Sequence, residues 1–259
     1  MGIEVLEKLP SEFTSLRKPP KSLWYVGDRS LLDRPKVSIV GTRRPSHYTR
    51  QTVRRLAGEL AKRGVVVVSG GAMGVDALAH LGAGPAQTIA VLGTGVDVRY
   101  PAINRELLES IEREGLLLSP FEPGFRATRW SFVLRNELVV ALGEILVVAE
   151  AEEGSGSMRS AEYALKQGKE IWVLPHRLGE SGGTRRLLEE ELARPILSVE
   201  ALAERFGCVP SSGMGRDEFF FFCQKRPTLE EAVDRFGERV YEEELEGRIL
   251  VENGRVSLV

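Results

Sequence analysis

The chain has 259 residues, of which 42% are hydrophobic and 28% charged, and its formal net charge is −2. This composition predicts a large packed α/β domain with a small additional unit, and it excludes disordered and fibrous proteins. No apolar stretch reaches the roughly 18 residues that span a bilayer, and the amino-terminal residues lack a signal-peptide pattern. The two cysteines, Cys208 and Cys223, predict neither a disulfide framework nor a metal site. We therefore expect a cytoplasmic protein without membrane contact or metal.

Residues 1–35 are expected to be an extension of the domain that follows them. They contain Pro19-Pro20 and Trp24-Tyr25 in an irregular pattern. Because so short a segment is below the usual size of a domain, we expect it to pack on the neighbouring sheet.

Seven apolar, β-branched segments predict strands that begin near residues 37, 65, 88, 116, 145, 171 and 195. Amphipathic helical stretches separate most of them. In the first stretch, Val53, Leu56, Ala57, Leu60 and Ala61 recur at the spacing of one helix face. Strands that are apolar at nearly every position need cover on both faces. Residues 36–206 are therefore predicted to form an α/β, Rossmann-like, doubly wound and mainly parallel sheet.

The last part of the chain predicts a small winged-helix-like module. Residues 207–215 are rich in glycine and serine and are typical of a linker. Residues 216–259 contain an aromatic run from Phe219 to Phe222, two short helical patterns and a hairpin with an Asn253-Gly254 turn. The phenylalanines are more typical of a small core than of base stacking. Eight acidic residues between 228 and 246 disfavour a helix that reads DNA.

Loops rich in glycine, serine and threonine follow four of the predicted strands, where parallel sheets collect their ligands. The segment from Gly41 to Gly58 also holds five arginines and no acidic residue. Glycine lets a backbone approach a phosphate closely, and serine, threonine and arginine add donors. A single such loop often only turns the chain, but four together predict a phosphate site. The predicted contacts from these loops are Gly41, Thr42, Arg43, Arg44, Ser46, Ser69, Gly70, Gly71, Ser155, Gly156 and Ser157.

More arginines could extend this site into a track. Arg50 and Arg54 stand four residues apart on the first predicted helix, and Arg126, Arg129 and Arg135 lie near another strand end. A solvated helix face is the alternative for such residues. A track of several cations favours a polynucleotide ligand, because affinity grows with each phosphate neutralised.

The sequence predicts no cofactor and no catalytic turnover. The glycines match neither the dinucleotide-binding pattern nor the P-loop pattern. Asp76 and His80 share one helix face, for which a structural contact is a better interpretation than an acid/base pair. Ser155 and Ser157 have no base nearby in the sequence that would make either a nucleophile.

The chain resembles the DprA/Smf family of DNA-processing proteins. The matching segments, in order, are residues 37–50, 65–80, 88–111, 116–124, 135–139 and 147–175. The resemblance implies a protein that binds and protects incoming single-stranded DNA in natural transformation, helps to load the RecA recombinase, forms a homodimer and needs no nucleotide.

The resemblance also implies which residues contact phosphate. The family's G-[ST]-R-x-x-S loop falls on Gly41, Thr42, Arg43 and Ser46, and its serine-glycine loop falls on Ser155, Gly156 and Ser157. Its RNR motif falls on Arg135, Asn136 and Glu137, and the glutamate departs from the pattern because it would repel a phosphate. His176 stands where the family commonly has glycine.

Two other function classes stay open at this stage. The first is a Rossmann-like phosphoribohydrolase, although the nearest stretch, Ser181 to Arg186, lacks most of the PGGxGTxxE motif of those enzymes. The second is a protein-interaction scaffold, which the acidic carboxyl-terminal part favours but which leaves the arginines unexplained.

Overall fold

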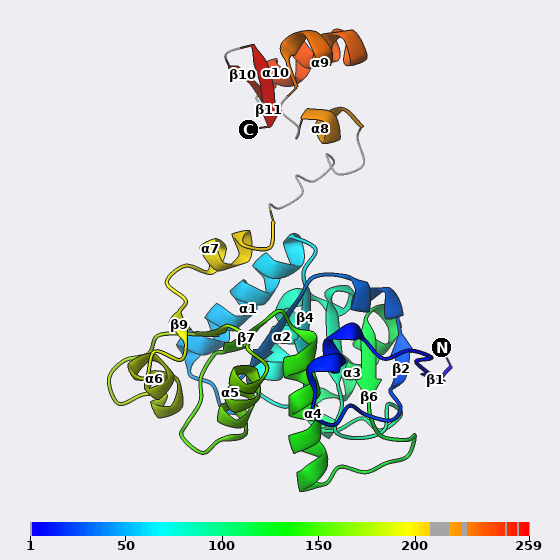
Figure 1. Ribbon diagram of the computed structural model, residues 1–259, viewed down its shortest axis with the longest axis vertical. Helices are drawn as coiled ribbons and strands as arrows, with labels where there is room; N and C mark the ends of the chain where they lie inside the picture. Colours follow the sequence, from blue (N-terminus) through cyan, green and yellow to red (C-terminus); the bar gives the residue numbers. More distant parts are fainter. Residues whose placement is uncertain (1, 208–217, 224–226, 247, 253, 259) are drawn as a thin grey trace. The chain divides into compact units, whose positions relative to one another are not determined.

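The computed structural model describes residues 2–207, 218–223, 227–246, 248–252 and 254–258. The chain divides into two compact units, Met1–Cys208 and Val209–Val259, and each is considered by itself. The first unit is built on a sheet of nine strands in the order β1-β2-β6-β5-β4-β3-β7-β8-β9 (Figure 1). The strands are β1 (Glu4–Val5), β2 (Trp24–Gly27), β3 (Lys36–Val40), β4 (Val66–Ser69), β5 (Thr88–Val91), β6 (Leu116–Ser119), β7 (Ile145–Val148), β8 (Ile171–Val173) and β9 (Arg194–Pro195).

All seven predicted strands are present, as β3 to β9, and they pair in parallel. The helices are α1 (His47–Lys62), α2 (Val75–Ala83), α3 (Arg105–Glu114), α4 (Arg129–Leu142), α5 (Gly156–Lys166), α6 (Gly182–Glu189) and α7 (Val199–Glu204). Short 3-10 turns lie at Ser11–Ser15, Arg29–Asp33, Pro85–Gln87 and Ala102–Asn104. The predicted Rossmann-like α/β fold is thus confirmed.

Alternate residues along each strand belong to different hydrophobic cores, because successive side chains point to opposite faces. Val66 and Val68 pack with apolar residues of α4 and α5. Val65 and Val67 pack with those of α1, α2 and α7. Both faces of the sheet are therefore covered by helices, which explains why these strands are apolar at nearly every position (Figure 1).

The amino-terminal extension adds two strands to one edge of the sheet. β2 pairs antiparallel with β6, so that Trp24 lies opposite Ser119 and Gly27 opposite Leu116. β1 pairs antiparallel with β2, and Tyr25 Oη donates a hydrogen bond to Glu4 Oε2 at 2.5 Å. These two short strands, which the sequence did not predict, join the segment to the sheet.

The second unit contains α8 (Glu218–Cys223), α9 (Leu229–Phe236), α10 (Arg239–Leu245) and an antiparallel hairpin of β10 (Ile249–Glu252) and β11 (Arg255–Leu258). The predicted hairpin is confirmed, and Gly254 in its turn has a φ of +72°. The rings of Phe219 and Phe222 lie 5.1 and 5.5 Å from that of Phe236, which confirms them as core residues. The side chains of Phe220 and Phe221 and most of the predicted linker, 208–215, lie outside the described residues. The winged-helix-like assignment stays a prediction.

None of the helices in the described part of the chain combines the length and apolar character needed to cross a membrane.

Candidate nucleic-acid interface

The loops that follow β3, β4 and β7 meet the inner side of α4 around a cleft of about 570 Å³, which we call the strand-end cleft. Its floor includes Val40 at the end of β3, and its walls include Phe132 and the start of α5. Ten of the predicted phosphate contacts line it: Gly41, Thr42, Arg43, Arg44, Gly70, Arg135, Asn136, Ser155, Gly156 and Ser157. The structure therefore brings together residues that lie more than 100 positions apart in the sequence.

The loop after β3 holds two arginines at the cleft. Thr42 N donates to Glu150 O at 2.7 Å, and Val75 N donates to Thr42 O at 3.1 Å, so the backbone is fixed on both sides. A β-carbon at Gly41 would lie 2.6 Å from Val75 Cγ2, which explains the glycine. Arg43 and Arg44 are exposed, and in the described part of the chain neither lies within ion-pair distance of a carboxylate. Both cations are available to an anionic ligand.

The first turn of α5 forms the opposite wall of the cleft. Ser155 caps this helix, since its Oγ accepts from Met158 N at 3.4 Å. The first backbone N–H groups of a helix lack partners within the helix and carry its positive dipole end. Gly156 and Ser157 therefore present an anion-binding backbone to the cleft.

Arg159 also lines the strand-end cleft and is exposed, although the sequence did not single it out. It lies four residues after Ser155, and thus on the same side of the first helical turn. The cleft has four arginines, Arg43, Arg44, Arg135 and Arg159, against two carboxylates, Asp76 and Glu152. Four minus two leaves an excess of two positive charges, in a chain whose net charge is negative.

Arg135 differs from the expected surface donor because it is only 4% exposed. Its Nη1 lies 3.6 Å from Asp76 Oδ2, and its guanidinium lies 5.8 Å from the centre of the Phe132 ring. Burial raises the pKa of Asp76, and the charge of Arg135 offsets part of that rise. The ion pair stabilises the wall of the cleft. The buried Arg135 also adds positive electrostatic potential to the cleft that it lines.

Three other predicted contacts are used inside the protein. The buried Ser69 Oγ donates to Ile39 O at 2.6 Å, and Gly71 N donates to His80 Nε2 at 3.3 Å. Ser46 caps α1, and its backbone N and its Oγ both donate to Glu150 Oε2 at 2.9 Å. None of the three lines the strand-end cleft. Their donors already have partners within the protein, and their role as phosphate contacts stays a prediction.

Glu150 acts as the anchor for the start of α1. Burial raises its pKa, but hydrogen bonds from Thr49 and Ser46 and the nearby His176 bring the net change below the usual value. His176, which stands where the family commonly has glycine, belongs to the same network. Its Nε2 lies 3.1 Å from Thr49 Oγ1.

The predicted contact between Asp76 and His80 was wrong. Asp76 faces Arg135, while His80 Nδ1 lies 2.6 Å from Thr88 Oγ1. Thr88 Oγ1 donates to Val67 O, so it accepts from His80, and Nδ1 carries the imidazole proton. Burial lowers the pKa of His80 to about 3.

The residues of the extended track are exposed but do not line the cleft. These are Arg50, Arg54, Arg126 and Arg129. Arg55, counted among the unopposed arginines of this segment, lies 2.6 Å from Glu200 of α7. Glu137, expected to repel phosphate, is not a lining residue of the cleft. Burial raises the pKa of Tyr163, and the charge of Glu137 adds to that rise.

The stretch compared with phosphoribohydrolases has a structural role. Ser181 and Thr184 are buried, and their hydroxyl oxygens lie 2.6 Å apart. Ala151 N also donates to Ser181 Oγ at 2.9 Å. These contacts tie α6 to the end of β7 and leave both hydroxyls occupied.

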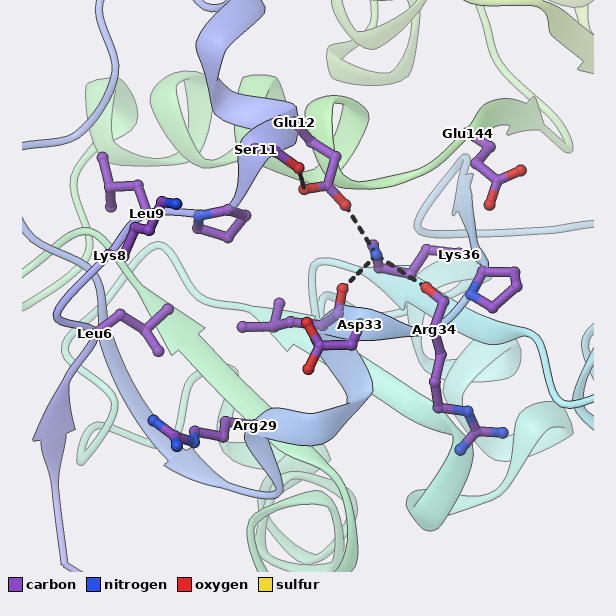
Figure 2. A pocket seen from close by; sticks show the side chains of 13 residues that line it. Leu6, Lys8, Leu9, Ser11, Glu12, Arg29, Asp33, Arg34, Lys36 and Glu144 are labelled. Carbon is purple, nitrogen blue, oxygen red and sulfur yellow. Dashed lines mark hydrogen bonds and ion pairs between the residues drawn. The ribbon is translucent and has the colours of Figure 1, made fainter.

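Figure 2 shows a larger cleft, of about 740 Å³, between the amino-terminal extension and the start of β3. Lys36 Nζ lies 2.8 Å from Glu12 Oε1 and donates to the carbonyls of Leu32 and Arg34. This lysine therefore holds the extension in place. The cleft lies at the amino ends of the strands, the end opposite to that at which parallel sheets bind ligands.

Comparison with known proteins identifies the family. The family model described as DNA recombination-mediator protein A matches residues 4–207. This chain belongs to that family. It is 34% identical over 203 residues to DNA processing protein DprA of Bacillus subtilis, an alignment that covers 76% of this chain and 68% of that protein. It is 35% identical over 217 residues to protein Smf of Synechocystis. That alignment covers 81% of this chain but only 54%, about half, of the relative.

Two solved structures of DNA processing protein A are similar to about three quarters of this chain. The Helicobacter pylori protein, whose single-stranded DNA binding mode has been described, is 44% identical, with a TM-score of 0.77 over 78% of this chain and 94% of that one. The Streptococcus pneumoniae protein is 34% identical, with a TM-score of 0.70 over 76% of this chain and 70% of that one. The recognition of the DprA/Smf family from the sequence is thus confirmed.

Proposed function

We propose that this chain binds single-stranded DNA by placing backbone phosphates in the strand-end cleft. The observation that carries the proposal is the arrangement of Arg43 and Arg44 opposite the first turn of α5, with backbone donors on one side and free cations on the other. The Helicobacter pylori relative, described as a single-stranded DNA binder, supports it. Such donors bind phosphates of any sequence, so little base preference is expected.

The shape of the cleft favours single strands over duplex. The cleft has a volume of about 570 Å³, and residues of α4, among them Phe132 and Arg135, line it. A single strand can bend into it, whereas duplex DNA is stiff over roughly 150 base pairs. Duplex DNA would reach only the exposed rim.

The test is fluorescence anisotropy of a labelled oligonucleotide, single-stranded or duplex, at several salt concentrations. We expect Arg43→Ala to weaken single-strand binding about tenfold, as loss of a hydrogen-bonded charge does. The slope of log affinity against log salt should fall by about 0.7 for each phosphate that the variant no longer neutralises.

Arg113→Ala is the matched control, because Arg113 is exposed in the last turn of α3, where that helix leads into the amino end of β6. It removes the same charge away from the strand-end cleft and should bind like the wild type. Equal losses in Arg43→Ala and Arg113→Ala would show a general charge effect and no site. A wild type that binds no single strand would overturn the proposal.

We further propose that the protein acts as a homodimer that delivers bound DNA to the RecA recombinase, as the DprA/Smf resemblance implies. The expected result is faster assembly of RecA on single strands covered by a single-strand-binding protein, measured by RecA ATPase activity. Sedimentation should give twice the mass of the chain. Stimulation that persists in Arg43→Ala would separate the RecA role from the cleft.

A further inference from the structure

Three aromatic rings form a cluster on the loop after β6 and the first turn of α4. Phe121 and Phe125 stack with ring centres 4.4 Å apart and an interplanar angle of 12°. Trp130 meets both rings nearly at right angles, at 5.3 and 5.8 Å. Trp130 is 56% exposed, whereas Phe121 is 7% exposed. The phenylalanines therefore support an indole that faces solvent for more than half of its surface.

This cluster rests on a rigid support. Ser131 Oγ donates to Gly93 O at 2.7 Å, and Thr128 and Ser131 form a capping box at the start of α4. Gly124 N donates to Asp97 Oδ1 at 2.8 Å, and Gly95 N donates to Phe125 O at 2.9 Å. Both segments that carry the rings are thus fixed to residues 93–97. The position of Trp130 is set before any ligand arrives.

The cluster is linked to the strand-end cleft through the first turn of α4. Phe132, two residues after Trp130, lines that cleft together with Arg43. Gly93, to which Ser131 is bonded, lies with Arg43 and Phe132 around a smaller pocket of about 30 Å³. Arg126 and Arg129 precede Trp130 in the sequence and are exposed. The nearby acidic residues are Glu122 and Asp97. An exposed aromatic on a segment that also carries exposed cations is suited to a nucleobase joined to phosphates.

We propose that Trp130 stacks on an unpaired base of the strand whose phosphates occupy the strand-end cleft. The inference rests on the proposed function and adds a base contact to it. Every base has a flat aromatic face, so the contact needs no particular sequence. It does need an unstacked base, and it would therefore select single strands over duplex.

The test compares two ligands of equal length, an oligothymidylate and an abasic oligomer with the same phosphates. Trp130→Ala should weaken oligothymidylate binding about tenfold, the scale of one base-aromatic stack. The affinity of Trp130→Ala for the abasic oligomer should stay within about twofold of the wild-type affinity. A surface substitution alone can cause a difference of that size. Trp130→Phe keeps an aromatic face and should recover most of the affinity. Leu81→Ala, at a residue of similar exposure (52%) in the last turn of α2, is the control.

The outcomes separate this inference from the proposed function. If Trp130→Ala binds both ligands like the wild type while Arg43→Ala weakens both, the cleft binds phosphate and the stacking proposal is overturned. If Trp130→Ala loses equal affinity for both ligands, Trp130 only supports the loop, and stacking is also overturned. Weaker binding of oligothymidylate alone, with an unchanged thermal unfolding midpoint, supports stacking. A wild type that binds neither ligand removes both proposals.

Discussion

Gly70 and Arg135 share one space beneath the strand-end cleft. A β-carbon at Gly70 would lie 1.1 Å from Arg135 Nη1 and 2.8 Å from Asp76 Oδ2. The guanidinium is buried, so it could make room only by leaving its carboxylate partner. Glycine at this position is therefore required by the ion pair, whereas the sequence suggested that it lets a phosphate approach.

Gly70→Ala should destabilise the protein. Displacing Arg135 separates a buried ion pair, and breaking such pairs costs about 3 kcal/mol or more. Urea unfolding should show this decrease in the free energy of unfolding. Gly156→Ala is the control, because a β-carbon there would come no closer than 3.8 Å to Asn136 Nδ2. A Gly70→Ala protein as stable as the wild type would mean that Arg135 has a second position of equal energy.

The Asp76 and Arg135 substitutions should be strongly non-additive. Asp76→Ala leaves a buried guanidinium without its counter-charge, and Arg135→Met leaves a buried carboxylate, each costing about 3–5 kcal/mol. The double variant removes both charges, so its destabilisation should fall short of the sum by about 1–3 kcal/mol. A double-mutant cycle of unfolding free energies measures this difference. Strict additivity would show that the 3.6 Å pair contributes no coupling.

The stability of the protein should fall as the pH is lowered below about 6.5, because of His80. Its folded-state pKa of about 3 lies below the ordinary value of 6.5, so between these values the unfolded chain binds the proton. A proton on Nε2 would also oppose Gly71 N–H, which now donates to that atom. The decrease in stability should reach about 2.5 kcal/mol by pH 4.5.

Urea unfolding at pH 7.0 and 4.5 isolates this contribution when wild type and His80→Asn are compared. The variant should lose less stability on acidification. His47→Asn, at the exposed start of α1, should follow the wild type. Equal pH dependence in all three proteins would show that His80 is protonated without cost in the folded state.

The sequence was sufficient to place the main elements of the cleft. Apolar runs located β3 to β9, and the glycine-rich loops after β3, β4 and β7 marked the cleft, because parallel strands end at one edge of the sheet. Arg43 and Arg44 followed from their position directly after the first of these strands. The edge strand β2 was missed because four residues, Trp24–Gly27, carry too little periodicity to identify.

The sequence could not show which donors already have partners. Ser69, Gly70 and Gly71 are neighbours, yet only Gly70 lines the cleft. The Ser69 hydroxyl bonds to Ile39 of the adjacent strand, a contact set by the pairing of β3 with β4. Arg55 pairs with Glu200, a residue far away in the sequence, so this contact also depends on the fold. The role of Ser46 as the N-cap of α1 could have been predicted, since a serine before an amphipathic helix is a common N-cap.

Arg159→Ala should weaken single-strand binding by an amount similar to Arg43→Ala. Arg159 lies across the strand-end cleft from Arg43, on the first turn of α5, and is exposed. Removing it should reduce affinity about tenfold and lower the salt slope by about 0.7, because one fewer phosphate is neutralised. Lys166→Ala, at the last turn of the same helix, is the matched control.

The combination of Arg43→Ala with Arg159→Ala tests whether the two walls of the cleft hold one strand. If each arginine binds its own phosphate, the two decreases in binding free energy should add and the salt slope should fall by about 1.4. If both contact a single phosphate, the second substitution should cost much less than the first. Anisotropy titrations at three salt concentrations distinguish these cases. A double variant that binds like the wild type would show that the DNA lies elsewhere on the first unit.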